Sequence, residues 1–168
     1  MPVPTTSRLR LGTFNLLHGL SLADGGARES ELRDAVARTD ADILGLQEVD
    51  RSQDRSGGVD QAAVAADALG ATWWRFTPAV DGTPGVRDGW APSTADDGLH
   101  TSGPTYGVAL VSRFPVLDWR VRRFAPAPVA LPLLVPGGKG FMSVDDEPRV
   151  AIAAVVEGPR GPMTVVTA

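Results

Sequence analysis

Two polar side chains close apolar runs in the first third of the chain. Asn15 ends the run at residues 9–16, and Glu48 lies near the end of the run at residues 42–49. Mg²⁺ prefers hard oxygen ligands, typically one or two carboxylates, with water and phosphate completing its shell. The Asn15 amide can donate and accept hydrogen bonds at once, so it can orient a carboxylate or a metal-bound water. Glu48 and Asn15 are therefore the candidate metal-binding and catalytic residues.

The surrounding residues predict how these two side chains are positioned. Residues 9–16 and 42–49 are apolar enough for buried strands. Between them, residues 31–39 have apolar side chains at helical spacing, and Ser30 is expected to cap that helix. A strand, a helix and a strand in succession form a parallel pair, and open α/β sheets bind ligands at the carboxyl ends of their strands. The two candidate residues are therefore expected to lie side by side.

The remaining chain predicts a second helix and then mostly strands. The helix covers residues 60–69, with Asp60 or a nearby residue as its cap and Gly70 at its end. Two segments rich in Gly and Pro, residues 81–105 and 125–146, are predicted as a long loop and an irregular excursion. The later strands are predicted at residues 72–80, 106–114, 118–124, 149–156 and 163–167.

Composition places the chain among globular proteins. Its 168 residues are 43% hydrophobic and 21% charged, which suits one domain that buries roughly 70% of its unfolded surface. No apolar stretch approaches the ~20 residues that span a bilayer, and no segment resembles a secretory leader, so we expect a cytoplasmic location. Cysteine is absent, which excludes disulfides. The net charge of −4 provides no overall positive field to attract nucleic acid.

Four short motifs follow one another along the chain. They are Asn-Leu-Leu-His-Gly at residues 15–19, Leu-Gln-Glu at 46–48, Tyr-Gly-Val-Ala-Leu-Val-Ser-Arg at 106–113 and Glu-Pro-Arg at 147–149. Together they resemble the endonuclease/exonuclease/phosphatase superfamily, whose members hydrolyse phosphoester bonds with magnesium. The resemblance implies an α/β fold with a mixed β-sheet and flanking helices. This would be the first half of a four-layer α/β sandwich, in which two sheets pack face to face with helices outside.

The resemblance also implies roles for individual residues. Glu48 would be the metal carboxylate and Asn15 its neighbour, with Mg²⁺ as the cofactor and Mn²⁺ as an alternative. Tyr106 would point to the site and donate to a phosphate oxygen, although a half-buried core tyrosine is an equal reading. Arg149 would contact phosphate. His18 would either contact phosphate at the rim or cap the following loop.

Other parts of the superfamily pattern do not occur in the sequence. The pattern continues with a histidine shortly after the last predicted strand, an Asp-x-Asn motif and a late Asp-His pair, and no Asp-x-Asn or Ser-Asp-His is present. Residues 1–168 are therefore expected to form a single partial domain whose carboxy-terminal half is absent, and to be catalytically silent alone. An unpartnered sheet would expose Val108, Leu110 and Ile152, so self-association is also expected.

Two classes of function remain open. In the first, the parent protein is a magnesium-dependent phosphoesterase acting on a nucleic acid, an inositol phosphate or a phospholipid head group, with loops such as residues 81–105 selecting the substrate. In the second, the chain is a non-catalytic binding module or a nonfunctional remnant that kept the fold without the turnover machinery. Downstream sequence carrying the missing motifs would favour the enzyme.

Overall fold

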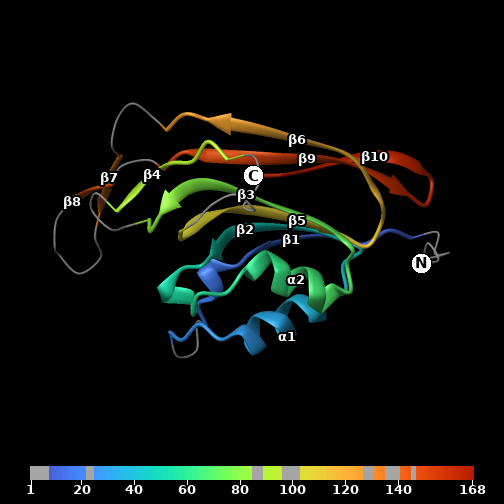
Figure 1. The fold of residues 1–168 in the computed structure, drawn as a ribbon, viewed down its shortest axis with the longest axis horizontal. Coiled ribbons are helices and arrows are strands. Elements are labelled where there is room, and N and C mark those ends of the chain that lie inside the picture. The colour runs from blue at the N-terminus through green and yellow to red at the C-terminus, as the bar shows by residue number, and fades with distance from the viewer. Residues whose placement is uncertain are drawn as a thin grey trace.

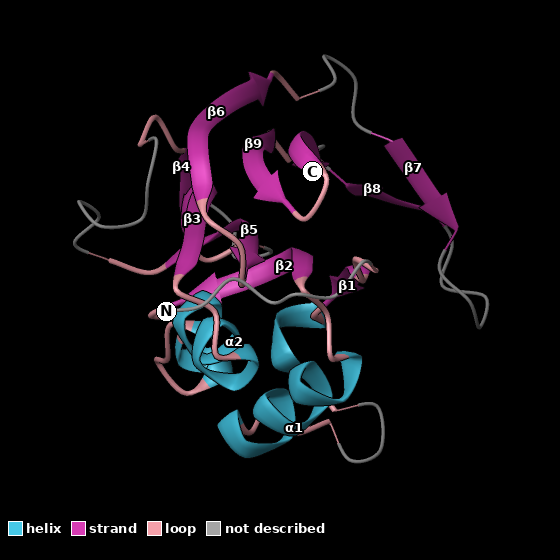
Figure 2. Cartoon of the chain, turned by 90° about the vertical axis from the view of Figure 1, so that its right-hand side faces the viewer, coloured by secondary structure: helices cyan, strands magenta, loops and turns pink. Residues whose placement is uncertain are grey.

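The computed structural model describes residues 8–21, 25–84, 89–95, 103–126, 131–134, 141–144 and 147–168. Two helices, a five-stranded sheet and a three-stranded sheet form three successive layers (Figure 1). The helices cover one face of the five-stranded sheet, and the three-stranded sheet lies over its other face (Figure 2). The chain therefore has the α/β architecture that its sequence predicted.

The five-stranded sheet carries both candidate metal-site residues. Its strands β1 (Leu11–Asn15) and β2 (Ile43–Arg51) are parallel, and the helix α1 (Glu29–Thr39) crosses between them, as predicted. Because β2 and β3 (Trp73–Gly82) pair with β5 (Thr105–Ser112) in antiparallel fashion, the sheet is mixed. The strand order across this sheet is β1, β2, β5, β3 and β4 (Trp90–Pro92).

The three-stranded sheet is formed by the last predicted strands. It is antiparallel throughout, and its order is β10 (Gly161–Thr167), β9 (Arg149–Gly158) and β6 (Val116–Phe124). All the predicted strands are thus confirmed, with shifts of a few residues at their ends.

Two apolar clusters hold the layers together. The first lies between the helices and the five-stranded sheet and includes Val36 and Leu44. The second lies between the two sheets and includes Val108, Leu110 and Ile152. The solvent-exposed fractions of these three residues are 8%, 0% and 0%. The expectation that these three side chains are exposed is wrong, because the second sheet covers them. Self-association stays a prediction that nothing in the fold tests.

Of the two predicted helix N-caps, one is confirmed and the other is wrong. The second helix, α2 (Gln61–Leu69), begins as predicted, because the Asp60 carboxylate accepts a 3.0 Å hydrogen bond from the backbone N–H of Ala63. Gly70 ends it with a left-handed backbone. Helix α1 instead starts at Glu29, and its N-cap is Arg28, which provides no side-chain cap. Ser30 is therefore already inside the helix, where its hydroxyl cannot act as the N-cap.

Two segments predicted to lack regular structure contain strands. Strand β3 continues to Gly82 and pairs with β4, so residues 81–105 are not entirely a loop. Within residues 125–146, a two-stranded hairpin forms from β7 (Leu131–Leu134) and β8 (Phe141–Val144). Pro132 and the high Pro and Gly content of its surroundings concealed this hairpin, since proline weakens a strand signal. Residues 85–88, 96–102, 127–130, 135–140 and 145–146 lie outside the described residues.

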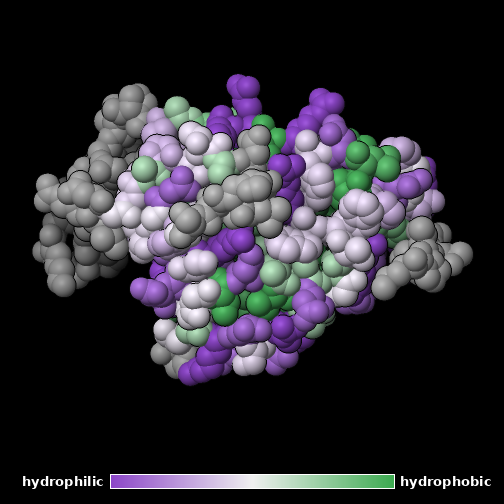
Figure 3. All heavy atoms as spheres, viewed as in Figure 1, coloured by the Kyte–Doolittle hydropathy of each residue, from purple (hydrophilic) through white to green (hydrophobic). Residues whose placement is uncertain are grey.

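The outer surface mixes polar and apolar side chains. On the face seen in Figure 3, apolar groups lie in small clusters among hydrophilic ones. Large exposed apolar side chains occur on the second sheet, at Leu117, Phe124 and Val166. Neither described helix combines the length and the hydropathy needed to cross a membrane.

Candidate active site

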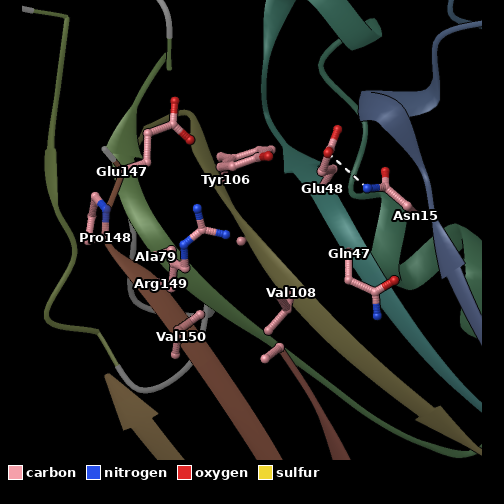
Figure 4. Close-up of a pocket in the computed structure, with 12 residues that line it drawn as sticks. Asn15, Gln47, Glu48, Ala79, Tyr106, Val108, Glu147, Pro148, Arg149 and Val150 are labelled. Carbon is pink, nitrogen blue, oxygen red and sulfur yellow. Dashed lines mark hydrogen bonds between the residues drawn. The ribbon is translucent and has the colours of Figure 1, made fainter. Parts of the chain in front are cut away.

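A cavity of about 470 Å³ opens between the two sheets, at the end of β1 and beside the bulge of β2. Four of the five predicted site residues line it, and the fifth, His18, lies next to them. Figure 4 shows Glu48 and Asn15 on one side of the cavity, with Glu147 and Arg149 on the other side. The complete lining is Asn15, Gln47, Glu48, Ala79, Tyr106, Gly107, Val108, Glu147, Pro148, Arg149, Val150 and Ala168.

Glu48 is placed by an irregularity of strand β2. The pairing of β2 with β5 shifts register between Leu46 and Val49, so the strand bulges at this point. Glu48 has a positive φ of 54°, a conformation that costs a residue other than glycine about 1–3 kcal/mol and is concentrated at functional sites. Bulges re-aim side chains out of the alternating pattern of a strand. The bulge thus brings the carboxylate to the cavity wall.

Asn15 holds that carboxylate in place. Its Nδ2 donates a 2.8 Å hydrogen bond to Glu48 Oε1, and its Oδ1 accepts a 2.9 Å hydrogen bond from the backbone N–H of Leu17. The amide is therefore fixed at both ends, and its N–H faces the carboxylate. The prediction that Asn15 and Glu48 lie side by side is confirmed, but Glu48 lies at a bulge inside β2 and not at the end of the strand.

His18 lies beside Glu48 within a short 3-10 helix, η1 (Leu17–Gly19). Its Nδ1 is buried without a hydrogen-bond partner among the described residues, and lies 3.8 Å from Glu48 Oε2. Burial lowers the pKa of the imidazole, and the nearby charge of Arg55 lowers it further. The lowered pKa favours the neutral imidazole, and the ring lies beside Glu48 and Tyr106. Its two predicted roles, phosphate contact and loop capping, both stay predictions.

Tyr106 forms the wall between the two sides of the cavity. Burial raises the pKa of its phenol, and the charges of Glu48 and Glu147 raise it further. The phenol therefore stays protonated at any physiological pH and can serve as a hydrogen-bond donor. Its partial burial also agrees with the alternative reading, so Tyr106 is at once a packed side chain and a cavity residue.

Arg149 and Glu147 approach from the second sheet. Arg149 is the first residue of β9, and Glu147 precedes it by two positions. Because Arg149 belongs to the second sheet and Glu147 lies on the segment that leads into it, the cavity depends on the packing of the two layers. Arg149, from the later part of the chain, therefore lies across the cavity from Glu48, which comes from the earlier part (Figure 4).

Three polar groups near the cavity were missed by sequence reasoning. Gln47 belongs to the same motif as Glu48, and its Nε2 donates a 2.8 Å hydrogen bond to Thr167 Oγ1 across the two sheets. Asp50 is fully buried and pairs with Arg55. Asp50 directly follows the apolar run at residues 42–49, and this position was the signal that could have identified it, since a buried charge requires a partner. Arg55 carries no comparable signal in the sequence.

The donor chemistry of this cavity suits a hard divalent cation. Glu48 offers a carboxylate whose Oε2 accepts no hydrogen bond from any described residue, and Asn15 orients the other oxygen. Within the described parts of the chain, no three His, Cys, Asp or Glu side chains converge on one metal position. One carboxylate with waters is sufficient for Mg²⁺, which keeps much of its hydration shell in proteins. The residues present therefore fit the ion, with Glu48 as the group that would hold it.

The fold and the cavity define an α/β protein with a carboxylate site at a bulge of its five-stranded sheet, and the sequence pattern assigns its family. The pattern of the Endonuclease/Exonuclease/phosphatase family matches residues 12–149. The chain belongs to this family. No curated protein shows a significant match to it.

Two solved structures share the fold. The endonuclease/exonuclease/phosphatase from Beutenbergia cavernae DSM 12333 is 22% identical with a TM-score of 0.56, and the match covers 95% of this chain and 37% of that one. An endonuclease/exonuclease/phosphatase family protein from Leptotrichia buccalis C-1013-b is 11% identical with a TM-score of 0.50, covering 96% and 54% respectively. This chain thus spans about a third to a half of the lengths of these proteins.

Proposed function

We propose that the full-length gene product is a metal-dependent phosphoesterase and that the cavity beside Glu48 is part of its active site. The observation that carries this proposal is the 2.8 Å hydrogen bond from Asn15, at the end of β1, to Glu48, at the bulge of the parallel neighbour β2. Membership in the family supports the reaction class. The cofactor is Mg²⁺, with Mn²⁺ as the alternative, and Glu48 is its ligand.

Each residue of the cavity has a distinct part in this proposal. The ion, when bound, stabilises negative charge on the phosphoryl oxygens. Asn15 keeps the Glu48 carboxylate in one orientation. The protonated Tyr106 phenol donates a hydrogen bond to a phosphate oxygen, and Arg149 pairs with the phosphate through its guanidinium. The neutral His18 lies close enough to Glu48 and Tyr106 to contact the same substrate group.

The proposal extends to the rest of the fold and to the substrate. The three layers described here would be the first half of a four-layer sandwich whose other half supplies further catalytic groups. The substrate is a phosphoester found in a nucleic acid, an inositol phosphate or a phospholipid head group. The net charge of −4 argues against a nuclease that binds nucleic acid by a general positive field. A cytoplasmic location agrees with these substrates.

A second candidate is a binding module without turnover. It is favoured by the single carboxylate that the described residues present to the cation, with no cluster of three ligating side chains. Such a protein would bind a divalent cation and a phosphoester in this cavity and release the ester unchanged. The two candidates therefore differ in hydrolysis and agree in binding.

Hydrolysis by the full-length gene product tests the proposal. Purified protein is assayed with bis(4-nitrophenyl) phosphate and with a panel of nucleic acid, inositol phosphate and phospholipid substrates, each with and without Mg²⁺. Glu48→Gln is expected to lower the metal-dependent rate by roughly a thousandfold, because the ion contributes several kcal/mol of charge stabilisation. Glu157→Gln, on the exposed surface of β9, is the matched control. Metal-dependent binding without hydrolysis would favour the binding module, and equal rates in wild type and Glu48→Gln would refute the proposed site.

A further inference from the structure

A buried ion pair lies beside the cavity and is not part of its lining. Asp50, two residues after Glu48 on β2, is fully buried, while Arg55 in the 3-10 helix η2 (Asp54–Ser56) keeps 29% of its side-chain exposure. Arg55 Nε donates to Asp50 Oδ2 at 2.9 Å, and Nη2 donates to Asp50 Oδ1 at 2.7 Å. Both carboxylate oxygens are engaged, so the guanidinium plane is fixed.

The fixed guanidinium lies over the ring of Tyr106. Its Cζ is 5.5 Å from the ring centroid, within the range of a cation–π contact. Tyr106 and Asp50 are direct partners in the pairing of β5 with β2, so the ion pair and the ring are held by the same two strands. The ring of His18 lies 6.0 Å from the ring of Tyr106 at an angle of 54°. Arg55 and His18 together therefore restrict where the tyrosine ring can lie.

Arg55 also balances the charges around the phenol. Glu48, Glu147 and Asp50 all act on Tyr106 as negative charges, and Arg55 acts on it with the opposite sign. Three carboxylates would repel an anionic phosphoester. The Nη1 of Arg55 makes no hydrogen bond within the described part of the chain, so its positive charge is not fully engaged by Asp50. The Arg55 guanidinium thus has a fixed position and a positive charge that favours an anionic phosphoester.

We propose that Arg55, held by Asp50, is the positioning residue that fixes the Tyr106 phenol for donation to the substrate phosphate. The role of the phenol rests on the proposed function, whereas the placement of the ring by Arg55 does not. Lysine cannot substitute, because its ammonium is a point charge without the planar fork that engages both oxygens of Asp50 and stacks on the ring.

Carbon-13 NMR of the tyrosine ring tests the placement without any turnover. Tyr106 is the only tyrosine among the 168 residues, and its signal is identified by its loss in Tyr106→Phe. We expect Arg55→Met and Arg55→Lys to shift this signal. The control Arg51→Met removes the neighbouring ion pair, in which Arg51 Nε lies 3.1 Å from Asp60 Oδ2, and should leave the signal in place.

A charge-neutral double variant guards against misfolding. Arg55→Met leaves Asp50 buried and unpaired, which can prevent folding. Asp50→Asn combined with Arg55→Gln removes both charges and keeps two hydrogen-bonding side chains, of which Gln is shorter than Arg. The double variant is also expected to shift the Tyr106 signal. An unchanged signal in a folded Arg55 variant would overturn the placement.

Steady-state kinetics of the full-length gene product completes the test. We expect Arg55→Met and Arg55→Lys to lower kcat by roughly tenfold to a hundredfold with little change in KM, because a small misplacement of a catalytic group has effects of this size. Rescue by Arg55→Lys would overturn positioning, since only the charge would then matter. If wild type hydrolyses no phosphoester, the proposed function fails, and the NMR shifts alone decide whether Arg55 places the ring.

Discussion

At the scale of single residues, the site depends on one amide that orients one carboxylate. Asn15 donates to Glu48 and accepts from the backbone of Leu17, so its orientation is set independently of any ligand. Glu48 in turn occupies a left-handed backbone conformation at a bulge. Neither the bulge nor the positive φ can be recognised from the motif Leu-Gln-Glu, since both arise from the pairing of β2 with β5. The sequence predicted that the two residues lie side by side, but it predicted neither the bulge nor the left-handed backbone of Glu48.

Removing the Asn15 amide tests its orienting role. Asn15→Ala is expected to shift the Mg²⁺ activation of hydrolysis to concentrations higher by roughly tenfold to a hundredfold, the usual cost of losing a group that orients a metal ligand. The full-length gene product is titrated with Mg²⁺ at fixed substrate. Thr13→Ala serves as the control, because Thr13 lies on the same strand and its hydroxyl donates a hydrogen bond to Gln47 and not to Glu48. A variant with the activation curve of wild type would show that Asn15 does not orient the ligand.

At the scale of elements, the strand and helix signals were strong wherever apolar periodicity was regular. The crossover from β1 through α1 to β2 and the cap of α2 at Asp60 followed from local residue patterns. Strands β4, β7 and β8 did not, because they are three or four residues long and lie among Pro and Gly. Their pairing depends on partner strands, and local propensity carries little information about such contacts.

Strands β3 and β5 approach each other so closely at Gly107 that we expect a larger side chain there to destabilise the fold. A Cβ on Gly107 would lie 2.1 Å from the Thr77 carbonyl oxygen and 2.8 Å from Pro78 Cα, both of which are backbone atoms. Gly107→Ala is therefore expected to destabilise the fold by about 1–3 kcal/mol, the usual range for overpacking. Urea unfolding measures the change. Gly103→Ala, where nothing lies within 4 Å of the added carbon, is the control; equal losses in both variants would contradict the argument.

The end of helix α1 predicts a pH dependence of stability. Asp40 is held by Arg113, whose Nη1 lies 3.1 Å from Oδ1, and by Arg10. Arg113 and Arg10 lower the pKa of Asp40 below its ordinary value of 3.8. The resulting stabilisation is present above that ordinary value and is lost as the pH falls through the lower pKa of the folded state.

Asp40→Asn removes this charge while keeping a side chain that tolerates the left-handed backbone of the residue. We expect a lower urea midpoint than wild type at pH 7, and a difference that shrinks as the pH falls through the lowered pKa of Asp40 and its carboxylate becomes protonated. Asp34→Asn, an exposed helical position, controls for the loss of a surface carboxylate. A midpoint difference that persists unchanged at the acidic end would show that the ion pairs are not its cause.

At the scale of the whole molecule, the cavity exists because the two sheets pack against each other. Thr167 of β10 links them, since its hydroxyl accepts the hydrogen bond from Gln47 and packs on Gly45, where an added Cβ would lie 2.8 Å from Oγ1. Face-to-face packing was implied by the family resemblance, but this bridge joins residues 120 positions apart in sequence. Such long-range polar contacts carry no local sequence signal.

Thr167→Val tests this link between the layers. Valine keeps the shape of the side chain but leaves the Gln47 amide without its acceptor, so a loss of about 1–3 kcal/mol in the free energy of unfolding is expected. Thr164→Val, at an exposed position of the same strand, is the control. Urea denaturation followed by tryptophan fluorescence reports both. A stability equal to that of wild type would show that the bridge contributes nothing to the packing of the sheets.

Calorimetric titration with Mn²⁺ tests the central claim most directly, because it asks whether Glu48 holds the cation without requiring turnover. The full-length gene product, Glu48→Gln and the control Glu157→Gln are titrated under identical conditions, with circular dichroism to show that all three are folded. We expect wild type and Glu157→Gln to bind Mn²⁺ equally, and Glu48→Gln to bind at least about tenfold more weakly. Equal affinity in wild type and a folded Glu48→Gln would contradict the assignment of this cavity as the metal site.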